Sequence, residues 1–221
     1  MYSKKDLAYL IGVIYGDGYI KNGTKSKKDK SIDYKISIEL TDISYLNNII
    51  LPLFKIFTNT KSKVRIRKRK NKKETGTLEV RNKNFFKFLT EELKIHKGPK
   101  KRGTKIPPAL HKWPKQLKYE FVAGYFDTDG GFRNKTIGFT SKNKEFIEFI
   151  DIILKEVKII AYKEKWLNKK YNKFYYGIKI KKDHIDTFLN TFKLRNFRKL
   201  ANIQAKFSCA GAGVVKRAGR E

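Results

Sequence analysis

The apolar positions of this chain follow the same order twice. Residues 10–18 read LIGVIYGDG and residues 122–130 read VAGYFDTDG, and each is a short apolar run, typical of a buried helix, that ends in Asp-Gly. Alternating apolar and polar residues come next and predict a β-hairpin, and apolar residues at helical spacing then predict a helix. A second hairpin and a closing helix, near 83–93 and 183–192, complete each half. The pattern predicts an αββαββα order that occurs twice, in α+β domains with antiparallel sheets.

The strands of the first half show which side chains would face outward. Apolar residues that alternate with polar ones predict a half-buried strand through Ile32, Tyr34, Ile36, Ile38 and Leu40. If these residues face the helices, the outward face carries Asp33, Lys35, Ser37, Glu39 and Thr41. In the next hairpin, Lys63, Arg65 and Arg67 alternate with apolar residues in the same way. The outward face of the predicted sheet is therefore rich in charged and polar groups.

A helix is predicted between the two hairpins of each half. In the first half, Thr41 or Asp42 can cap a helix whose apolar stripe ends at Phe57. Pro52 lies inside this helix and must bend it or leave one backbone bond unmade. In the second half, the matching stripe runs from Phe146 to Val157.

The two halves align at two offsets. An offset of 112 superimposes the Asp-Gly motifs, and an offset of 100 superimposes the segments that follow. The difference, 112 − 100 = 12, places an insertion after the first motif, where KNGTKSKKDKS at 21–31 predicts a long hairpin loop. At the offset of 100, Thr41 and Asp42 correspond to Ser141 and Lys142.

Composition divides the chain into two domains and a linker. The segment KGPKKRGTKIPP at 97–108 combines Gly, Pro and positive charge, which disfavour regular structure. We expect domains at 1–96 and 115–207 joined by a basic linker at 97–114. The segment 208–221 is rich in Gly and Ala and is expected to be a flexible tail.

The charge of the chain indicates its kind of partner. Lys and Arg number 52 against 21 Asp and Glu, a formal net charge of +31, which favours a polyanion such as nucleic acid. No apolar run approaches the roughly 18 residues of a membrane span, and no signal peptide opens the chain. The single cysteine, Cys209, excludes a disulfide framework within the chain. We therefore expect an intracellular protein, in the cytoplasm or an organelle matrix, that is not secreted and has no membrane partner.

The duplicated motif suggests a metal site. Gly12 and Gly16 lie four residues apart on one helical face, as do Gly124 and Thr128, and such small residues let two helix backbones approach closely. Close approach would place Asp17 and Asp129 side by side, where two carboxylates repel one another unless cations hold them. The pair suggests a site for a hard divalent cation.

Asp127 also belongs to the second motif, but it has no acidic counterpart. Its position in the first motif is taken by Tyr15. Because one half has an acid and the other an aromatic ring, we expect a structural or secondary role for Asp127 and not a place in the paired metal site.

With these two motifs at this separation, the chain resembles the LAGLIDADG homing endonucleases in their single-chain form, over about residues 6–207. The resemblance implies two pseudo-symmetric domains whose antiparallel sheets form a saddle in the DNA major groove. It implies a monomer that binds a long pseudo-palindromic or asymmetric target in double-stranded DNA, as in intron homing. The implied reaction is hydrolysis of one phosphodiester per strand with Mg²⁺ or Mn²⁺. The implied ligands are Asp17, Asp129 and the backbone carbonyl groups of Gly16 and Thr128.

The resemblance also implies supporting residues. Polar groups near the metal would be Thr41, Asp42, Ser141 and Lys142, with basic groups at Lys101 and Lys199. The expected DNA contacts are Lys21, Lys35, Ser37, Glu39, Lys63, Arg65, Arg67, Arg81, Arg133, Lys179 and Lys181. Asp42 opposite Lys142 would make the two halves unequal, so we expect the two strands to be cut at different rates.

Three other functions stay open at this level. The same fold could serve an intron maturase that binds RNA, or a DNA-binding regulator that does not cut. Charge alone would also suit a ribosomal-style RNA-binding protein, although the duplicated acidic motif would not be expected there. Since the chain starts at Met1 and ends at Glu221 without room for a splicing domain, we expect a freestanding, intron-encoded enzyme and not an intein.

Overall fold

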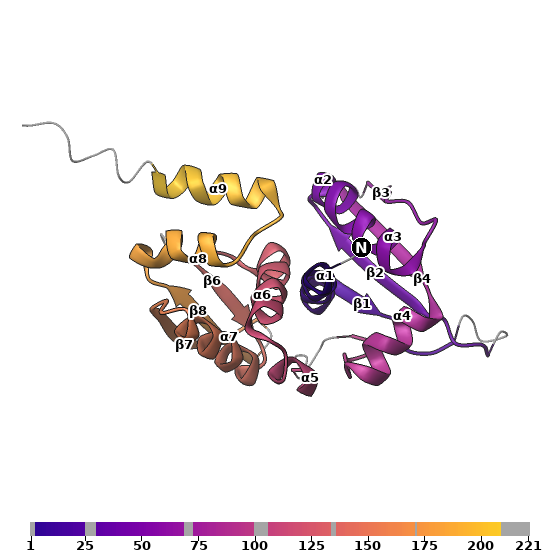
Figure 1. The fold of residues 1–221 in the computed structure, drawn as a ribbon, viewed down its shortest axis with the longest axis horizontal. Helices are drawn as coiled ribbons and strands as arrows, with labels where there is room; N and C mark the ends of the chain where they lie inside the picture. Colours follow the sequence, from indigo (N-terminus) through magenta and orange to yellow (C-terminus); the bar gives the residue numbers. More distant parts are fainter. Residues whose placement is uncertain are drawn as a thin grey trace, which may run out of the picture.

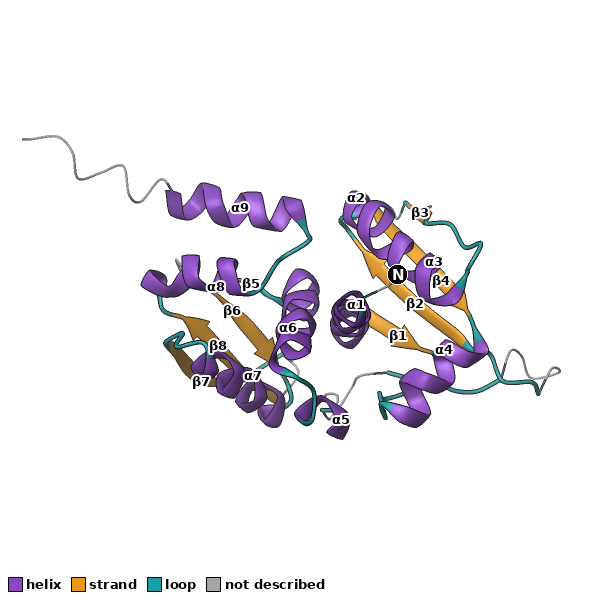
Figure 2. Cartoon of the chain, in the orientation of Figure 1, coloured by secondary structure: helices purple, strands orange, loops and turns teal. Residues whose placement is uncertain are grey.

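Two similar halves flank a central pair of helices in the computed structural model, which describes residues 3–24, 30–68, 73–99, 106–133, 136–170 and 172–208. The central pair is α1 (Lys4–Asp17) and α6 (Lys115–Asp129), the two motif helices. Figure 1 shows α1 and α6 side by side between the halves, and Figure 2 shows one sheet on each side of them. Among the described residues, no helix is both long and apolar enough to cross a membrane.

The first half has the predicted order. After α1 come β1 (Gly18–Ile20), β2 (Lys35–Leu40) and a helix built from α2 (Ile43–Tyr45), a π-helical turn (Leu46–Ile50) and α3 (Leu51–Thr58). Then follow β3 (Arg65–Arg67), β4 (Thr75–Arg81), α4 (Lys83–Lys87) and a second π-helical turn (Phe88–Glu92). The antiparallel sheet has the strand order β1-β2-β4-β3.

The second half repeats this order. After α6 come β5 (Gly131–Arg133), β6 (Thr136–Ser141), α7 (Lys144–Glu156), β7 (Ala161–Asn168) and β8 (Lys173–Ile180). A 3₁₀ turn (Lys182–His184) leads into α8 (Ile185–Thr191). The sheet order β5-β6-β8-β7 matches that of the first half, so the predicted α+β fold is confirmed. Two further helices were not predicted, α5 (Pro108–His111) and α9 (Phe197–Ser208).

The motif helices pack at backbone contact. A Cβ atom added at Gly12 would overlap the carbonyl oxygen of Phe121, and one added at Gly124 would overlap that of Tyr9. Next along the pair, a Cβ atom at Gly16 would overlap the hydroxyl of Thr128. The predicted close approach is confirmed, and it runs in register toward the ends where Asp17 and Asp129 lie.

The sheet register corrects one equivalence between the halves. Leu40 pairs with Gly76 in the first sheet, whereas Ser141 pairs with Tyr176 in the second. Counting on from these pairs, Thr41 corresponds to Lys142 and Asp42 corresponds to Asn143. The expectation that Asp42 lies opposite Lys142 is therefore wrong by one residue.

Helix capping gives the same alignment. The backbone N–H of Tyr45 donates to Asp42 Oδ1 at 3.0 Å, and that of Glu145 donates to Asn143 Oδ1 at 2.9 Å. Asp42 and Asn143 are thus the two N-caps. The first half then contains one extra residue, which the π-helical turn just before Pro52 takes up, since a π-turn inserts one residue into a helix.

The expectation for Ile32 is also wrong. Its side chain is 52% exposed, and β2 begins only at Lys35. Ile32 forms an isolated bridge with Thr24 at the base of the hairpin loop. The inward alternation in β2 is carried by Ile36 and Ile38, which are buried.

Candidate active site

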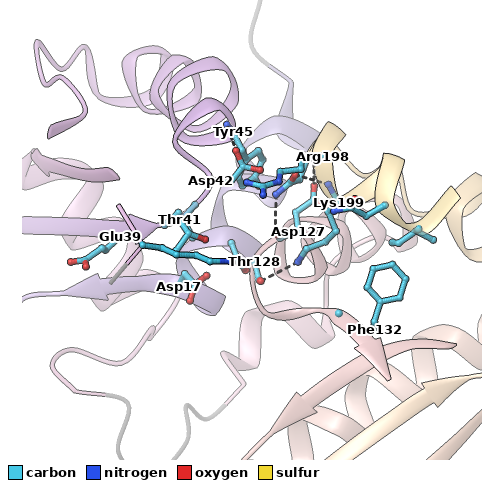
Figure 3. A pocket seen from close by; sticks show the side chains of 16 residues that line it. Asp17, Glu39, Thr41, Asp42, Tyr45, Asp127, Thr128, Phe132, Arg198 and Lys199 are labelled. Carbon is cyan, nitrogen blue, oxygen red and sulfur yellow. Dashed lines mark hydrogen bonds between the residues drawn. The ribbon is translucent and has the colours of Figure 1, made fainter. Parts of the chain in front are cut away.

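A cavity of about 520 Å³ opens at the ends of the motif helices. Asp17 from α1, Thr128 from α6 and Thr41 and Asp42 from the end of the first hairpin line it, together with Lys199 from α9. Figure 3 shows these side chains around the cavity. Residues far apart in the chain, from both halves, therefore meet at the point where the first motif delivers its carboxylate.

Asp17 and Asp129 are the last residues of α1 and α6. Their charges act on the same neighbour, the hydroxyl of Tyr125, whose pKa is raised first by burial and then by the charges of Asp129 and Asp17 among others. The ends of the two packed helices thus bring both carboxylates within electrostatic range of Tyr125. Tyr125 itself donates a hydrogen bond to the carbonyl oxygen of Thr140 at 3.2 Å.

Lys199 binds the end of the second motif helix. Its ammonium donates to the carbonyl oxygens of Phe126 at 2.7 Å, Thr128 at 3.1 Å and Gly130 at 2.7 Å. A cation is favourable there because a helix C-terminus carries unpaired carbonyl groups and partial negative charge. Burial lowers the pKa of Lys199, while the nearby charges of Asp127, Asp17, Asp129 and Asp42 oppose that shift. The Thr128 carbonyl expected at the metal already accepts this hydrogen bond.

Asp127 holds the segment that precedes α9. Its Oδ2 atom accepts hydrogen bonds from the Tyr9 hydroxyl, from the backbone N–H of Arg195 at 2.6 Å and from that of Asn196 at 3.0 Å. The side chain is buried, and burial raises its pKa. These contacts agree with the structural role expected for Asp127.

The corresponding place in the first motif is aromatic. Tyr15 packs against the rings of Phe121, Tyr125 and Phe146, with centroid distances of 5.0–5.9 Å. Among the described residues, the acid of the second motif thus binds a backbone segment, and the tyrosine of the first motif packs in the core.

Arg195 joins the two motif helices. Its guanidinium contacts Asp6 of α1 at 2.7 Å and Glu120 of α6 at 2.9 Å, and it lies 4.2 Å from the centroid of the Tyr9 ring. This residue was missed from the sequence, as was α9. The available signals were Asn196, which caps α9 by accepting from the Lys199 N–H at 3.0 Å, and an apolar spacing that includes Ile203 and Phe207.

The other supporting residues divide between two places. Thr41 and Asp42 line the cavity, whereas Ser141 and Lys142 are not among its lining residues. The Ser141 hydroxyl accepts from the Asn143 N–H at 3.0 Å, and the Lys142 ammonium lies 5.4 Å from the Tyr175 ring centroid. Lys101 lies outside the described residues.

Residues on the outward faces of the two sheets and at the ends of their strands form ion pairs. Several expected DNA-binding cations have acidic partners: Lys21 and Arg81 contact Asp33, Lys35 contacts Glu79, Arg67 contacts Glu39, Lys179 contacts Glu164, and Lys181 contacts Asp183. Ser37 pairs in register with Glu79. Lys63 and Arg65 are exposed, and the side chain of Arg133 lies outside what is described. These surfaces therefore carry both positive and negative charges, and the acidic partners hold the Lys and Arg side chains in place.

The oxygen ligands offered by the two motifs suit a hard divalent cation that also binds the substrate. Asp17 and Asp129 supply carboxylate oxygens, but the described residues contain no group of three His, Cys, Asp or Glu side chains placed to hold a metal ion. Mg²⁺ is commonly held by one or two carboxylates, with water and substrate phosphates as its remaining ligands. Asp17 lines the cavity, whereas Asp129 ends the neighbouring helix and is not among the lining residues, so a carboxylate of the first motif at the cavity wall fits that pattern.

Residues 116–193 match a family model described as a LAGLIDADG-like domain. A probable translation initiation factor IF-2 of Methanocaldococcus jannaschii is 31% identical over 180 residues, which are 80% of this chain and 14% of that protein. The replication factor C small subunit of the same organism is 26% identical over 200 residues, 90% of this chain and 10% of that protein. The chain thus spans about a seventh or less of either relative.

Several solved structures share the fold. The structure of I-DmoI in complex with DNA and Ca matches with a TM-score of 0.64 and 21% identity, over 86% of this chain and 89% of that one. The homing endonuclease I-WcaI bound to its DNA recognition sequence matches at 0.57 and 22%, over 93% and 86%. The N-terminal LAGLIDADG domain of DUF199/WhiA matches at 0.53 and 16%, over 90% and 88%.

Proposed function

We propose that this chain, with its LAGLIDADG-like second half and the fold of two-domain homing endonucleases, is a site-specific endonuclease that cuts both strands of DNA. The observation that carries the proposal is the convergence of the Asp17 and Asp129 helix ends, which depends on glycines at backbone contact. The net charge of +31 supports a nucleic-acid substrate.

Divalent metal, Mg²⁺ or Mn²⁺, would be held by Asp17 and Asp129, with the Gly16 and Thr128 carbonyl groups as further ligands. Solved structures of I-DmoI contain DNA with Mn or Ca, which supports this choice of metal. Bound there, the metal supplies a water of lowered pKa and stabilises the leaving 3′ oxygen.

The chain's own residues position the reacting groups. Close packing of α1 and α6 fixes the separation of the two carboxylates, and Lys199 fixes the last turn of α6 through three carbonyl oxygens. Lys199 also places a positive charge at the cavity wall, where it can attract a phosphate. The outward residues of the two sheets bind the duplex on either side.

A non-cleaving nucleic-acid-binding protein on the same fold is the second candidate. The fold is shared with the N-terminal LAGLIDADG domain of DUF199/WhiA as well as with homing endonucleases, so the fold alone does not decide between the two functions. An intron maturase that binds RNA belongs to the same alternative.

Cleavage of a plasmid pool separates these functions. Plasmids with random or genomic inserts are incubated with the chain in Mg²⁺, and in parallel with excess EDTA. We expect a subset of plasmids to become linear in Mg²⁺ alone. Retention of plasmids or of RNA on a filter, without linear product in either arm, would instead support a binding protein.

A further inference from the structure

The edge strands of the two sheets differ in chemistry at equivalent positions. In the first sheet, Arg67 of β3 pairs with Thr75 of β4. In the second, Trp166 of β7 pairs with Tyr175 of β8. Because β4 and β8 correspond at an offset of 100, Trp166 takes the place of Arg67 and Tyr175 takes the place of Thr75.

Trp166 and Tyr175 lie on the outward face of the second sheet. The inward residues of β8, Ile178 and Ile180, are buried, and Tyr175 and Gly177 alternate with them. At the position of Arg67, the outward face of the second sheet therefore carries aromatic rings, next to the Lys179–Glu164 ion pair.

The two rings stack against each other on this face. Their centroids are 5.9 Å apart with planes inclined by 21°, and the Lys142 ammonium lies 5.4 Å from the Tyr175 centroid. Trp166 also extends over Gly177, since a Cβ atom added there would lie 3.0 Å from the indole Cζ3. The absence of a side chain at Gly177 lets the indole lie against the strand.

Two of the cations beside these rings have described contacts. Lys179 contacts Glu164 at 2.6 Å, and Lys142 lies at the Tyr175 ring. The aromatic pair thus offers apolar contact beside an ion pair, whereas Arg65 and Arg67 offer hydrogen-bond donors.

These differences select different bases. In the major groove, arginine donates to the O6 and N7 atoms of guanine, while apolar side chains contact the C5 methyl group of thymine. Resting on the proposed function, we propose that the Trp166–Tyr175 pair binds thymine methyl groups in one half of the target. The half bound by the first sheet has no such requirement, so the target is asymmetric in base composition.

The test removes the methyl group without changing base pairing. Duplexes bound by the wild-type chain are first selected from a random library in Ca²⁺. Thymine is then replaced by 2′-deoxyuridine in one half of the selected duplex at a time. We expect weaker binding for one half only, by roughly fourfold for each contacted methyl group, from about 0.8 kcal/mol per buried carbon and 1.4 kcal/mol per tenfold.

Two variants connect the effect to the aromatic pair. Trp166→Ala should bind the thymine duplex more weakly and should no longer distinguish deoxyuridine from thymine. Phe174→Ala is the matched control, since Phe174 is an exposed aromatic residue of β8 that pairs with Leu167 and alternates to the opposite face. It should keep the full deoxyuridine effect.

Three results would overturn the inference. The first is equal affinity for thymine and deoxyuridine duplexes in both halves. The second is a Trp166→Ala variant that keeps the wild-type sensitivity to deoxyuridine. The third is a Trp166→Ala variant that loses binding to single-stranded DNA or RNA but not to duplex. The last would make the rings a stacking surface for unpaired bases. If the library yields no bound duplex at all, the proposed function itself is wrong.

Discussion

The ammonium of Lys199 lies 3.1 Å from the carbonyl oxygen of Thr128, the residue directly before Asp129. Helix α9 thus reaches back to the motif helix and holds the turn that presents the second carboxylate. In the first half, the corresponding carbonyl belongs to Gly16, and the basic residue expected there, Lys101, lies outside the described residues. A lysine, Lys199, is thus observed at the motif of the second half.

Replacing Lys199 should loosen the end of α6. Lys199→Met removes the donor to three carbonyl oxygens and should lower the free energy of unfolding by about 2 kcal/mol, because hydrogen bonds to charged groups contribute roughly 1.5–3 kcal/mol. Chemical denaturation measures this change. The double-strand cleavage rate should also fall, and Lys199→Arg, which keeps charge and donors, should recover part of it. Equal rates for Lys199→Met and the wild type would contradict the positioning role.

Enlarging Gly12 should separate the motif helices. A Cβ atom at this position would overlap the Phe121 carbonyl oxygen, so Gly12→Ala should lower the free energy of unfolding by about 3 kcal/mol. The matched control is Gly131→Ala, where an added Cβ has no heavy atom within 4 Å, and its effect should stay within about 0.5 kcal/mol. Similar melting curves for the two variants would show that the helices do not pack this closely.

Asp42 should act as a helix cap and not as a metal ligand. Its counterpart Asn143 caps the equivalent helix with an amide oxygen. Asp42→Asn should therefore keep double-strand cleavage within about threefold, since Asp and Asn cap helices about equally well. The cleavage rates of Asp42→Asn and of the wild type are measured across a range of Mg²⁺ concentrations. A marked rise in the Mg²⁺ requirement would place Asp42 at the metal instead.

The ion pairs of Asp151 should appear as a pH dependence of stability. Burial opposes its ionised form, but hydrogen bonds from Lys155 at 2.9 Å and an ion pair with Lys163 at 3.2 Å outweigh this and lower its pKa. A lowered folded-state pKa gives stability that is present above the ordinary pKa of about 3.9 and is lost as the pH falls through the folded-state value.

The variant Asp151→Asn tests this sign. It should be less stable than the wild type near neutral pH by roughly 1 kcal/mol, because the two lysines are largely in water. Denaturant unfolding at a series of pH values should show the difference shrinking as the solution becomes more acidic than the ordinary pKa. A difference in stability between the two proteins that grows as the pH falls would contradict the lowered pKa of Asp151.

The fold was predictable because its main signals are local. The apolar runs that end at Asp17 and Asp129 specify helices, and alternation around Ile36 and Ile38 specifies a strand that is buried on one face. The repeat doubled each signal, and glycine spacing alone predicted the helix contact. The prediction that Ile32 faces the helices was wrong because the alternation of apolar and polar residues continues into the loop, where Ile32 is exposed.

The surroundings of the site depend on contacts that sequence does not encode locally. A single π-helical turn shifts the alignment by one residue, which hid the equivalence of Asp42 and Asn143. The segment before α9 is fixed by the buried carboxylate of Asp127, 68 residues before Arg195. Such long-range hydrogen bonds carry no periodicity, so Arg195 and α9 could not be placed at the motif in advance.

Cleavage of a selected duplex by the Asp17→Asn and Asp129→Asn variants tests the central claim most directly. Each substitution keeps the size of the side chain and removes a carboxylate, so binding to the duplex should remain while double-strand cleavage falls at least roughly 100-fold. Duplex affinity and product are measured in the same samples, with Asp42→Asn as the matched control. Double-strand breaks at the wild-type rate in either motif variant would contradict the paired-carboxylate site.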